Sequence, residues 1–211
     1  MKFPKAKIAC PSYQVSYGNR VVTPIWRSVD LEHDSLVNDF FEMATGPFWI
    51  CNSSCIAIER EELLQMNDYF PERETVYEDF DLWIRLGAKY LVAHSNKICA
   101  VYQRITDKNA RKAHQNKVVY SETYMNTLDT LVALPERTEQ QKYWIREIKD
   151  RRMVPYIFSL LCIGEKKKAK ETISLWNPTN KYRKYYVCLK LVSYVPVKMV
   201  RFIQSIRYKL F

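Results

Sequence analysis

The feature that most constrains the fold of this chain is a change of pattern about halfway along it. Up to residue 105, β-branched and aromatic runs alternate with short amphipathic segments; from about residue 116 the pattern is helical to the end. The helical part is interrupted at prolines and one glycine: Pro135, Gly164, Pro178 and Pro196. We therefore predict an α/β domain over residues 1–115 and an all-helical region over residues 116–211.

Within the first region the pattern predicts individual elements. Residues 7–26 read as strands around a hairpin-like turn at "YGNR", and residues 90–94 and 98–105 as two further strands. Leu31, Leu36, Phe40 and Met43 recur at helical spacing, which predicts a helix over residues 31–44. We also expect two extended pieces around the polar residues 52–54, a short helix over 61–67, and a helix over 78–87 that ends at Gly87.

Composition excludes several classes of protein. Hydrophobic residues make up 47% of the 211, so the chain can bury a core. The four glycines form no phosphate-binding loop, and no run is long and apolar enough for a signal peptide or a membrane span. Cys51 and Cys55 are the only close pair among six cysteines, and nothing completes a zinc site around them. We expect reduced, mostly buried thiols and a cytoplasmic protein.

The positive charge is concentrated at the C-terminus. The net charge is +10, and residues 172–211 contain no acid but eight basic residues: Lys181, Arg183, Lys184, Lys190, Lys198, Arg201, Arg207 and Lys209. A solvated basic face on a packed helical hairpin would explain this pattern. A peripheral anchor on an anionic membrane surface, at the inner face, would explain it as well. Nucleic-acid binding fits less well, because the rest of the chain is near neutral.

The most specific stretch is "VYEDFDLWIRLG", residues 76–87, in which three carboxylates crowd into four positions. Acids in the first helical turn interact favourably with the helix dipole, and Asp81 can pair with Arg85 four residues on. Alternatively, the helix N-terminus holds Asp79 ionised so that it can take a proton from an incoming hydroxyl group. Trp83 lies one turn away and could face the same cleft.

Four motifs follow one another in a familiar order: "NSSCIAIERE", "NDYFPE", "YEDFDLWIRL" and "AVYQR". Over about residues 4–105 the chain resembles the acceptor half of family 2 glycosyltransferases, inverting enzymes with the GT-A fold. One departure is that Asn67 and Asp68 replace the glycine usual before the F-P-E turn. Asparagine tolerates positive φ, so the turn can be kept.

The resemblance implies roles for individual residues. Asp79 would be the catalytic base that deprotonates the acceptor hydroxyl, with Glu78 beside it as an orienting contact. Ser53 and Ser54 would line the acceptor region, Trp83 would form its wall, and Arg85 would contact the substrate side while bracing the helix. His114 lies where some relatives place a histidine or arginine near the diphosphate.

The resemblance also implies parts that this sequence does not show. The family's nucleotide-binding half and its Asp-x-Asp motif, which holds Mg²⁺ or Mn²⁺ on the diphosphate, have no counterpart here; Asp30 and Asp34 stand at the wrong spacing. We therefore expect a partial GT-A domain, incomplete as an enzyme by itself, with a separately encoded N-terminal half as a candidate partner.

The expected function is transfer of a sugar from a nucleotide-sugar donor to a glycan or lipid-linked acceptor, in cell-surface polysaccharide or glycoconjugate synthesis. One alternative is a non-catalytic remnant or scaffold that retains the acceptor half. Another is a basic protein that binds membrane surfaces or nucleic acid.

Overall fold

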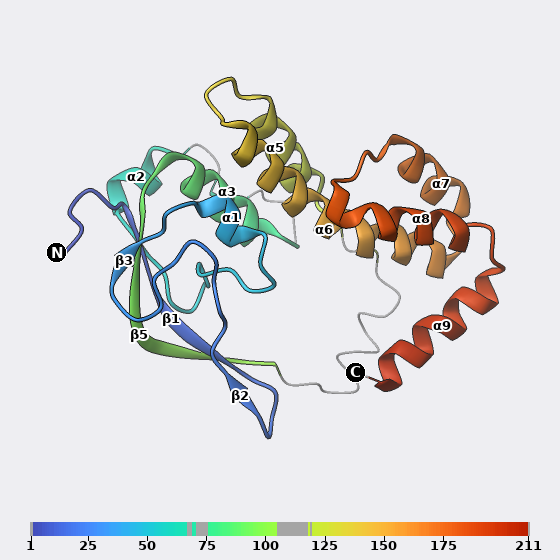
Figure 1. The fold of residues 1–211 in the computed structure, drawn as a ribbon, viewed down its shortest axis with the longest axis horizontal. Coiled ribbons are helices and arrows are strands. Elements are labelled where there is room, and N and C mark those ends of the chain that lie inside the picture. Colours follow the sequence, from blue (N-terminus) through green and yellow to red (C-terminus); the bar gives the residue numbers. More distant parts are fainter. Residues whose placement is uncertain (1, 67–68, 71–75, 105–117, 119, 211) are drawn as a thin grey trace. The chain divides into compact units, whose positions relative to one another are not determined.

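The computed structural model of the chain describes residues 2–66, 69–70, 76–104, 118 and 120–210. Two compact units form (Figure 1): one from residues up to 104 with residues 121–145, the other from residues 146–211. The first unit mixes strands and helices and the second is helical, so the predicted α/β and helical classes are both present. The predicted boundary near residue 115 lies outside the described residues.

A five-stranded mixed sheet organises the first unit. Its long central strands, β1 (Ile8–Ser16) and β5 (Val92–Gln103), run parallel. The three other strands are short and pair antiparallel, two with β1 and one with β5: β2 (Val21–Val22), β4 (Ala57–Ile58) and β3 (Ser35–Leu36). The two strands predicted over 90–105 are therefore one continuous strand.

The β1–β2 hairpin confirms the turn predicted at "YGNR". Val15 pairs with Val22, and the Tyr17 amide donates to the Arg20 carbonyl at 2.7 Å. Gly18 takes a φ of 88°, a left-handed conformation that glycine adopts without a steric cost.

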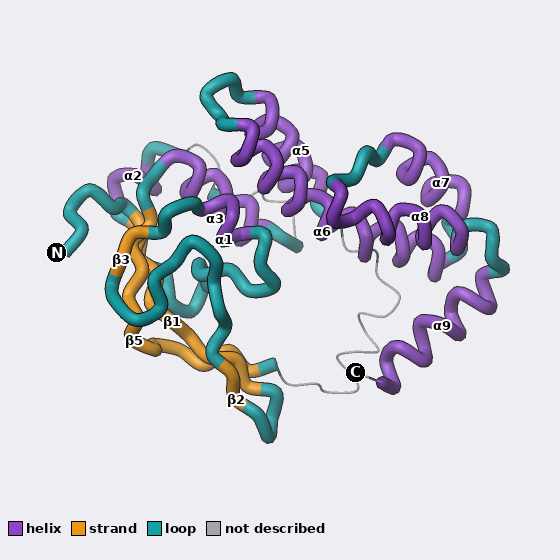
Figure 2. The backbone as a smooth tube through the Cα atoms, in the orientation of Figure 1, coloured by secondary structure: helices purple, strands orange, loops and turns teal. Residues whose placement is uncertain are grey.

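The helix predicted over 31–44 is only partly correct. Helix α1 covers Phe40–Ala44, because Asp39 caps it by accepting from the Phe41 and Glu42 amides at 2.9 and 3.0 Å. Ser35 and Leu36 form strand β3 on the edge of β5 instead. Figure 2 shows how much of the chain around these short elements is loop.

Helices α2 (Arg60–Leu64) and α3 (Glu78–Lys89) follow, and α3 continues past the stop predicted at Gly87. Gly87 has a packing role: a Cβ there would lie 2.4 Å from the Phe40 ring. The glycine thus allows α1 and α3 to approach, side by side along the sheet in Figure 1. Helix α5 (Glu122–Ala133) begins at the N-cap Ser121 and packs on α3 through buried Tyr124 and Leu128.

The second unit consists of the rest of α6 (Glu139–Ile163), then α7 (Lys166–Leu175), the 3₁₀ turn η1 (Asn180–Tyr182), α8 (Arg183–Val192) and α9 (Val197–Leu210). The helix ends agree with the predicted breaks, and Gly164 takes a φ of 97°. Pro155 lies inside α6 without ending it.

Buried acids of α6 hold the second unit together. The carboxylate of Asp150 accepts from the Trp176 indole at 2.6 Å and from the amide and hydroxyl of Thr179 at 2.7 Å each. Glu147, also buried, pairs with Lys181 at 2.8 Å. Basic residues of the C-terminal region therefore also serve the core. No helix in the described ranges is long and apolar enough to cross a membrane.

Candidate functional site

The start of helix α3 brings the predicted site residues together. The N-cap Tyr77 has a φ of 64° and a ψ of 13°, the left-handed conformation that a residue with a side chain adopts at a cost. Glu78 and Asp79 follow directly in the first turn, and both are half-buried. Backbone strain thus sits beside the two carboxylates that the sequence singles out.

Asp79 contacts the polar turn that the sequence predicted beside it. The Ser53 hydroxyl donates to Oδ2 of Asp79 at 3.4 Å, and the Phe80 amide donates to Oδ1 at 2.8 Å. Ser53 and Asp79 are 26 residues apart in sequence. The tertiary structure therefore joins a predicted substrate-binding residue to the predicted base.

Burial changes the expected electrostatics of Asp79. Desolvation raises the pKa of its carboxyl above the ordinary 3.8, and the neighbouring Glu78 raises it further, against the lowering by the Phe80 amide and the Ser53 hydroxyl. The sequence had suggested that the helix N-terminus would stabilise the charged form. The net direction is opposite, and it makes the ionised carboxylate a stronger base.

The turn that carries the serines is anchored by two buried cysteines. Cys51 and Cys55 flank it; the Cys51 sulfur meets that of Cys10 at 3.3 Å, and the Cys55 amide donates to the Asn52 carbonyl at 2.8 Å. Ser53 and Ser54 are exposed at the tip. The close cysteine pair is thus a pair of core anchors, and the prediction of mostly buried free thiols is confirmed.

Asp81 and Arg85 brace the helix, as predicted, but in a buried setting. Arg85 Nε donates to Asp81 Oδ2 at 2.8 Å, and Arg85 Nη2 donates to the Tyr69 carbonyl at 3.0 Å. Thr127 of α5 donates to the other Asp81 oxygen at 2.6 Å. The Asp81 side chain is 3% exposed, so the interaction is a tie between α3 and α5 and not the surface pair that the sequence suggested.

Trp83 does not form the wall that the resemblance implied. It is 5% exposed, so its ring belongs to the core and offers no face to a sugar. Position 83 lies on the side of α3 that also buries Leu82 and Leu86. The tryptophan faces inward because that side packs against the rest of the unit.

An aromatic cluster that sequence reasoning missed lies at this end of α3. The rings of Trp49 and Phe80 are 4.7 Å apart, and the Tyr77 ring lies 5.9 Å from those of Phe80 and Tyr124. Trp49 and Tyr124 are buried, whereas Tyr77 and Phe80 are half-buried. Tyr77 and Phe80 flank the acidic pair in the sequence itself, which is the signal that could have found them.

The two histidines among the described residues, His33 and His94, have no part in this site. His94 is buried between the Ser12 hydroxyl at 2.9 Å and the Asp30 carbonyl at 3.1 Å, and desolvation lowers its pKa, which favours the neutral ring. These contacts give His94 a structural role. His33 is exposed and lies outside any helix. His114 lies outside the described residues.

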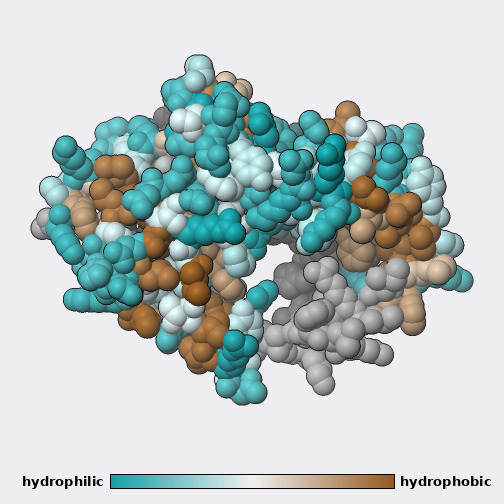
Figure 3. All heavy atoms as spheres, viewed as in Figure 1, coloured by the Kyte–Doolittle hydropathy of each residue, from teal (hydrophilic) through white to brown (hydrophobic). Residues whose placement is uncertain are grey.

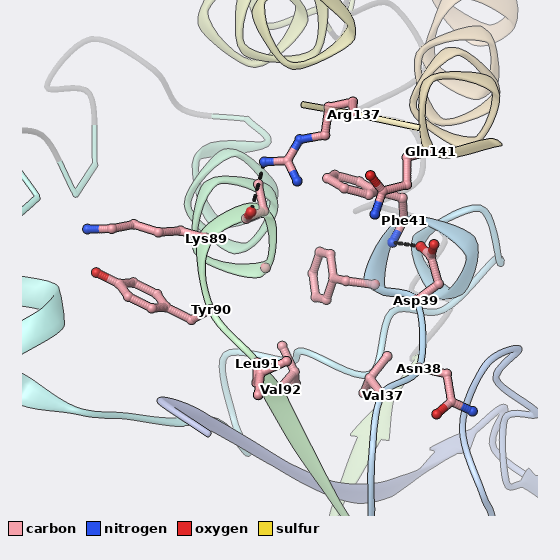
Figure 4. A pocket seen from close by; sticks show the side chains of 13 residues that line it. Val37, Asn38, Asp39, Phe41, Lys89, Tyr90, Leu91, Val92, Arg137 and Gln141 are labelled. Carbon is pink, nitrogen blue, oxygen red and sulfur yellow. Dashed lines mark hydrogen bonds between the residues drawn. The ribbon is translucent and has the colours of Figure 1, made fainter. Parts of the chain in front are cut away.

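A pocket of about 230 Å³ opens elsewhere, at the far end of α3 (Figure 4). Arg137 reaches across it, donating from Nη2 to the Ala88 carbonyl at 2.9 Å, with its guanidinium 5.3 Å from the Phe41 ring. Asp39, also at its edge, is engaged as the cap of α1. These contacts tie α1, α3 and the start of α6 together, so we interpret the pocket as structural.

The described residues contain no group of three or more His, Cys, Asp or Glu side chains that could hold a metal ion. The divalent cation expected for the complete enzyme stays a prediction. Comparisons of the chain with protein-family models, with curated proteins and with solved structures found no match.

Proposed function

We propose that this chain supplies the acceptor side and the catalytic base of an inverting glycosyltransferase of the family 2, GT-A type. The reaction is transfer of a sugar from a nucleotide-sugar donor to a glycan or lipid-linked acceptor in the synthesis of cell-surface polysaccharide or glycoconjugate, on the cytoplasmic side. The observation that carries the proposal is the contact of Ser53 with Asp79, because it joins two motifs that only the resemblance linked.

The geometry suits proton abstraction from a sugar hydroxyl. Asp79 is half-buried with a raised pKa, Glu78 adds a second carboxylate, and the exposed Ser53 and Ser54 offer hydroxyl groups to an acceptor. Because Trp83 is buried, we assign the apolar acceptor contact to Tyr77 and Phe80 instead. Sugars stack well on partly exposed aromatic faces.

The acceptor O–H bond breaks as its proton passes to a carboxylate oxygen of Asp79. The freed oxygen forms a bond to the anomeric carbon of the donor sugar. The bond from that carbon to the diphosphate breaks on the opposite side, and the electron pair leaves with the nucleoside diphosphate. The configuration at the anomeric carbon inverts.

The donor side of this proposal lies beyond the residues on which the site is built. Mg²⁺ or Mn²⁺ on the diphosphate would stabilise the leaving group, but the described part of the chain offers no metal cluster, so no step is assigned to a metal here. A separately encoded N-terminal half is the partner that we propose for donor binding.

The test is release of nucleoside diphosphate from a panel of nucleotide-sugars, with glycan and glycolipid acceptors. The chain is assayed alone and together with the polypeptide encoded directly upstream of Met1. Asp79→Asn should lower the rate of transfer about 10²–10⁴-fold, the usual contribution of a general base. Glu122→Gln is the matched control, since Glu122 is an exposed acid in the first turn of α5.

A fully active Asp79→Asn protein would remove the base assignment. If neither the chain nor the combination transfers sugar but the chain binds acceptor glycans, the non-catalytic scaffold replaces the enzyme as the function. The donor binding of the combination should be unchanged by Asp79→Asn, which separates loss of the base from loss of assembly.

A further inference from the structure

Helix α8 presents apolar side chains to solvent along one face. Val187 and Leu191 within α8, and Tyr194 two residues beyond its end, are 51%, 65% and 68% exposed. They recur at intervals of four and three residues, so they lie on one side of the helix. We call Val187, Leu191 and Tyr194 with the exposed Lys184 the α8 face.

The opposite side of α8 is fixed in the core of the second unit, which determines the direction of the α8 face. Leu189 and Ser193 are 5% and 1% exposed, and the Tyr186 ring lies 5.9 Å from that of Trp176. Trp176 is in turn held by Asp150. The apolar face is therefore a stable surface and not a consequence of a loosely packed helix.

Cations lie beside the α8 face. Lys190 of α8 is exposed, and Lys170 of α7 lies with its Nζ 4.1 Å from the Tyr194 ring. Lys198 and Arg201 of α9 are exposed as well, and Arg201 Nε donates to the Cys162 carbonyl at 2.8 Å. Residues 172–211 contain no acid. The nearest exposed acids along the chain are Glu165 and Glu171, at and within α7. The surface is complementary to an anionic partner.

Exposed apolar side chains occur on α9 as well. Met199 and Phe202 are 57% and 65% exposed, whereas Val200 is fully buried. Figure 3 shows hydrophobic residues, in brown, gathered over α8 with hydrophilic residues beside them. A free anion such as phosphate would use the cations alone and would leave this apolar area in water.

We propose that the α8 face, with Met199 and Phe202, binds the surface of an anionic lipid bilayer. The apolar side chains enter the interfacial region while the lysines and arginines stay at the headgroups. No helix among those described could cross the bilayer, so the contact is peripheral. Each basic residue near such a surface adds to the attraction, which salt screens.

Substitution of exposed residues tests the membrane contact better than deletion of the C-terminal helices. Lys181 pairs with the buried Glu147, and Leu189 and Val200 belong to the core, so removing residues 181–211 would damage the second unit itself. The exposed residues of the α8 face can be changed without that loss.

The experiment is co-sedimentation of the full chain with vesicles of phosphatidylcholine, with and without 30% phosphatidylserine. We expect binding to the anionic vesicles at low salt, strong weakening at high salt, and little binding to neutral vesicles. Val187→Asp/Leu191→Asp should abolish binding, with an unchanged circular dichroism spectrum. Ile25→Asp, at an 82% exposed residue of the first unit, is the matched control and should bind normally.

A charge variant makes the second test. Lys184→Gln/Lys190→Gln should lower the partition coefficient on anionic vesicles about 10–30-fold, as two contributions of about 1 kcal/mol imply. Lys5→Gln/Lys97→Gln removes two exposed lysines of the first unit and should change little.

Three results would overturn the proposal: no binding to anionic vesicles, equal loss in the control variants, or tighter binding to oligonucleotides than to vesicles at matched salt. A dimer that forms in solution and dissociates in Val187→Asp/Leu191→Asp would assign the face to a second copy instead. The proposal is independent of sugar transfer, since none of these variants touches Asp79.

Discussion

At the scale of single residues, Asp79 has properties that folding alone does not explain. Its burial opposes ionisation, and the carboxylate of Glu78 lies next to it. Tyr77, which precedes Glu78, takes a left-handed conformation. Each of these features costs stability. Asp150, a buried acid of the second unit, accepts three hydrogen bonds in return, whereas Asp79 accepts a long one from Ser53 and one from its neighbour.

The raised pKa of Asp79 predicts a pH dependence of stability. The unfolded chain ionises near the ordinary 3.8, before the folded protein does, so the free energy of unfolding falls as the pH rises through the interval between the two values. Asp79→Asn removes this term. Urea unfolding should show the variant at least as stable as the wild type at pH 7, with the difference shrinking toward pH 3.5. A variant clearly less stable at pH 7 would contradict the assignment.

The same shift predicts the pH profile of transfer. Only the ionised carboxylate accepts a proton, so activity should fall as the pH drops through the folded pKa, at a pH above that of an ordinary aspartate. The rate of nucleoside diphosphate release across the acid limb measures it. In Asp79→Asn this limb should disappear from the residual rate; its persistence there would assign it to another group.

At the scale of elements, α3 is held by two different devices. A buried ion pair with a threonine ties its middle to α5, and a glycine allows α1 to pack close to its last turn. Together they fix the orientation of the helix whose first turn carries Glu78 and Asp79.

The buried tie predicts an asymmetry between its two partners. Arg85→Ala leaves the Asp81 carboxylate buried without its cation and should cost about 3–5 kcal/mol of unfolding free energy. Asp81→Ala leaves an arginine that is 25% exposed and can be solvated, so it should cost about 1.5–3 kcal/mol, the value of hydrogen bonds to a charged group. Urea unfolding compares them with Glu139→Ala, which breaks an exposed pair with Lys142 and should cost under about 1 kcal/mol.

The close approach of α1 and α3 predicts the effect of filling it. Gly87→Ala gains helix propensity, but its Cβ meets the Phe40 ring at 2.4 Å, so the net effect should be a loss of about 1–3 kcal/mol. In Gly87→Ala/Phe40→Ala the space for the new Cβ is free. The double variant should therefore lose less unfolding free energy than the sum of the losses of the two single variants. Thermal or urea unfolding of the wild type, both single variants and the double variant measures this. Additive losses would show that the Gly87→Ala loss does not come from contact with Phe40.

At the scale of the whole molecule, the candidate site and the excess positive charge lie in different units. The first carries the candidate site on a mixed sheet with its helices, and the second carries most of the excess positive charge on helices of its own. Buried polar contacts stabilise the second unit as well as apolar packing. Asp150 of α6 accepts a hydrogen bond from Trp176, and Glu147 of α6 pairs with Lys181.

Asp150→Ala should therefore loosen the second unit. The Trp176 indole and the Thr179 amide and hydroxyl lose their acceptor, which should cost about 3 kcal/mol or more in total. Hydrogen exchange should lose protection chiefly within residues 146–200. Asp150→Asn, which keeps an acceptor oxygen, should lie between; uniform loss across the first unit would show that the contact serves the whole chain.

Features that depend on neighbouring residues in the chain can be predicted from the amino-acid sequence alone. The hairpin at Gly18 and the helix ends near Pro135, Gly164, Pro178 and Pro196 follow from local backbone preferences, and the structure confirms them. Glu78 and Asp79 mark the candidate site in the sequence because they are adjacent at a predicted helix start, whereas the contacts of the flanking Tyr77 and Phe80 emerge only in the structure. The resemblance to a glycosyltransferase stays a prediction.

Which side chains are buried, and what they contact, depends on the packing of elements that are distant in the chain. Helical spacing placed Trp83 next to Asp79 but could not show that this side of α3 faces the core. It paired Asp81 with Arg85 but could not supply Thr127, 46 residues away, and it took Gly87 as a stop where Phe40 requires a glycine. Burial and contact between distant residues depend on how the elements pack, and the packing sets both the raised pKa of Asp79 and the outward direction of the α8 face.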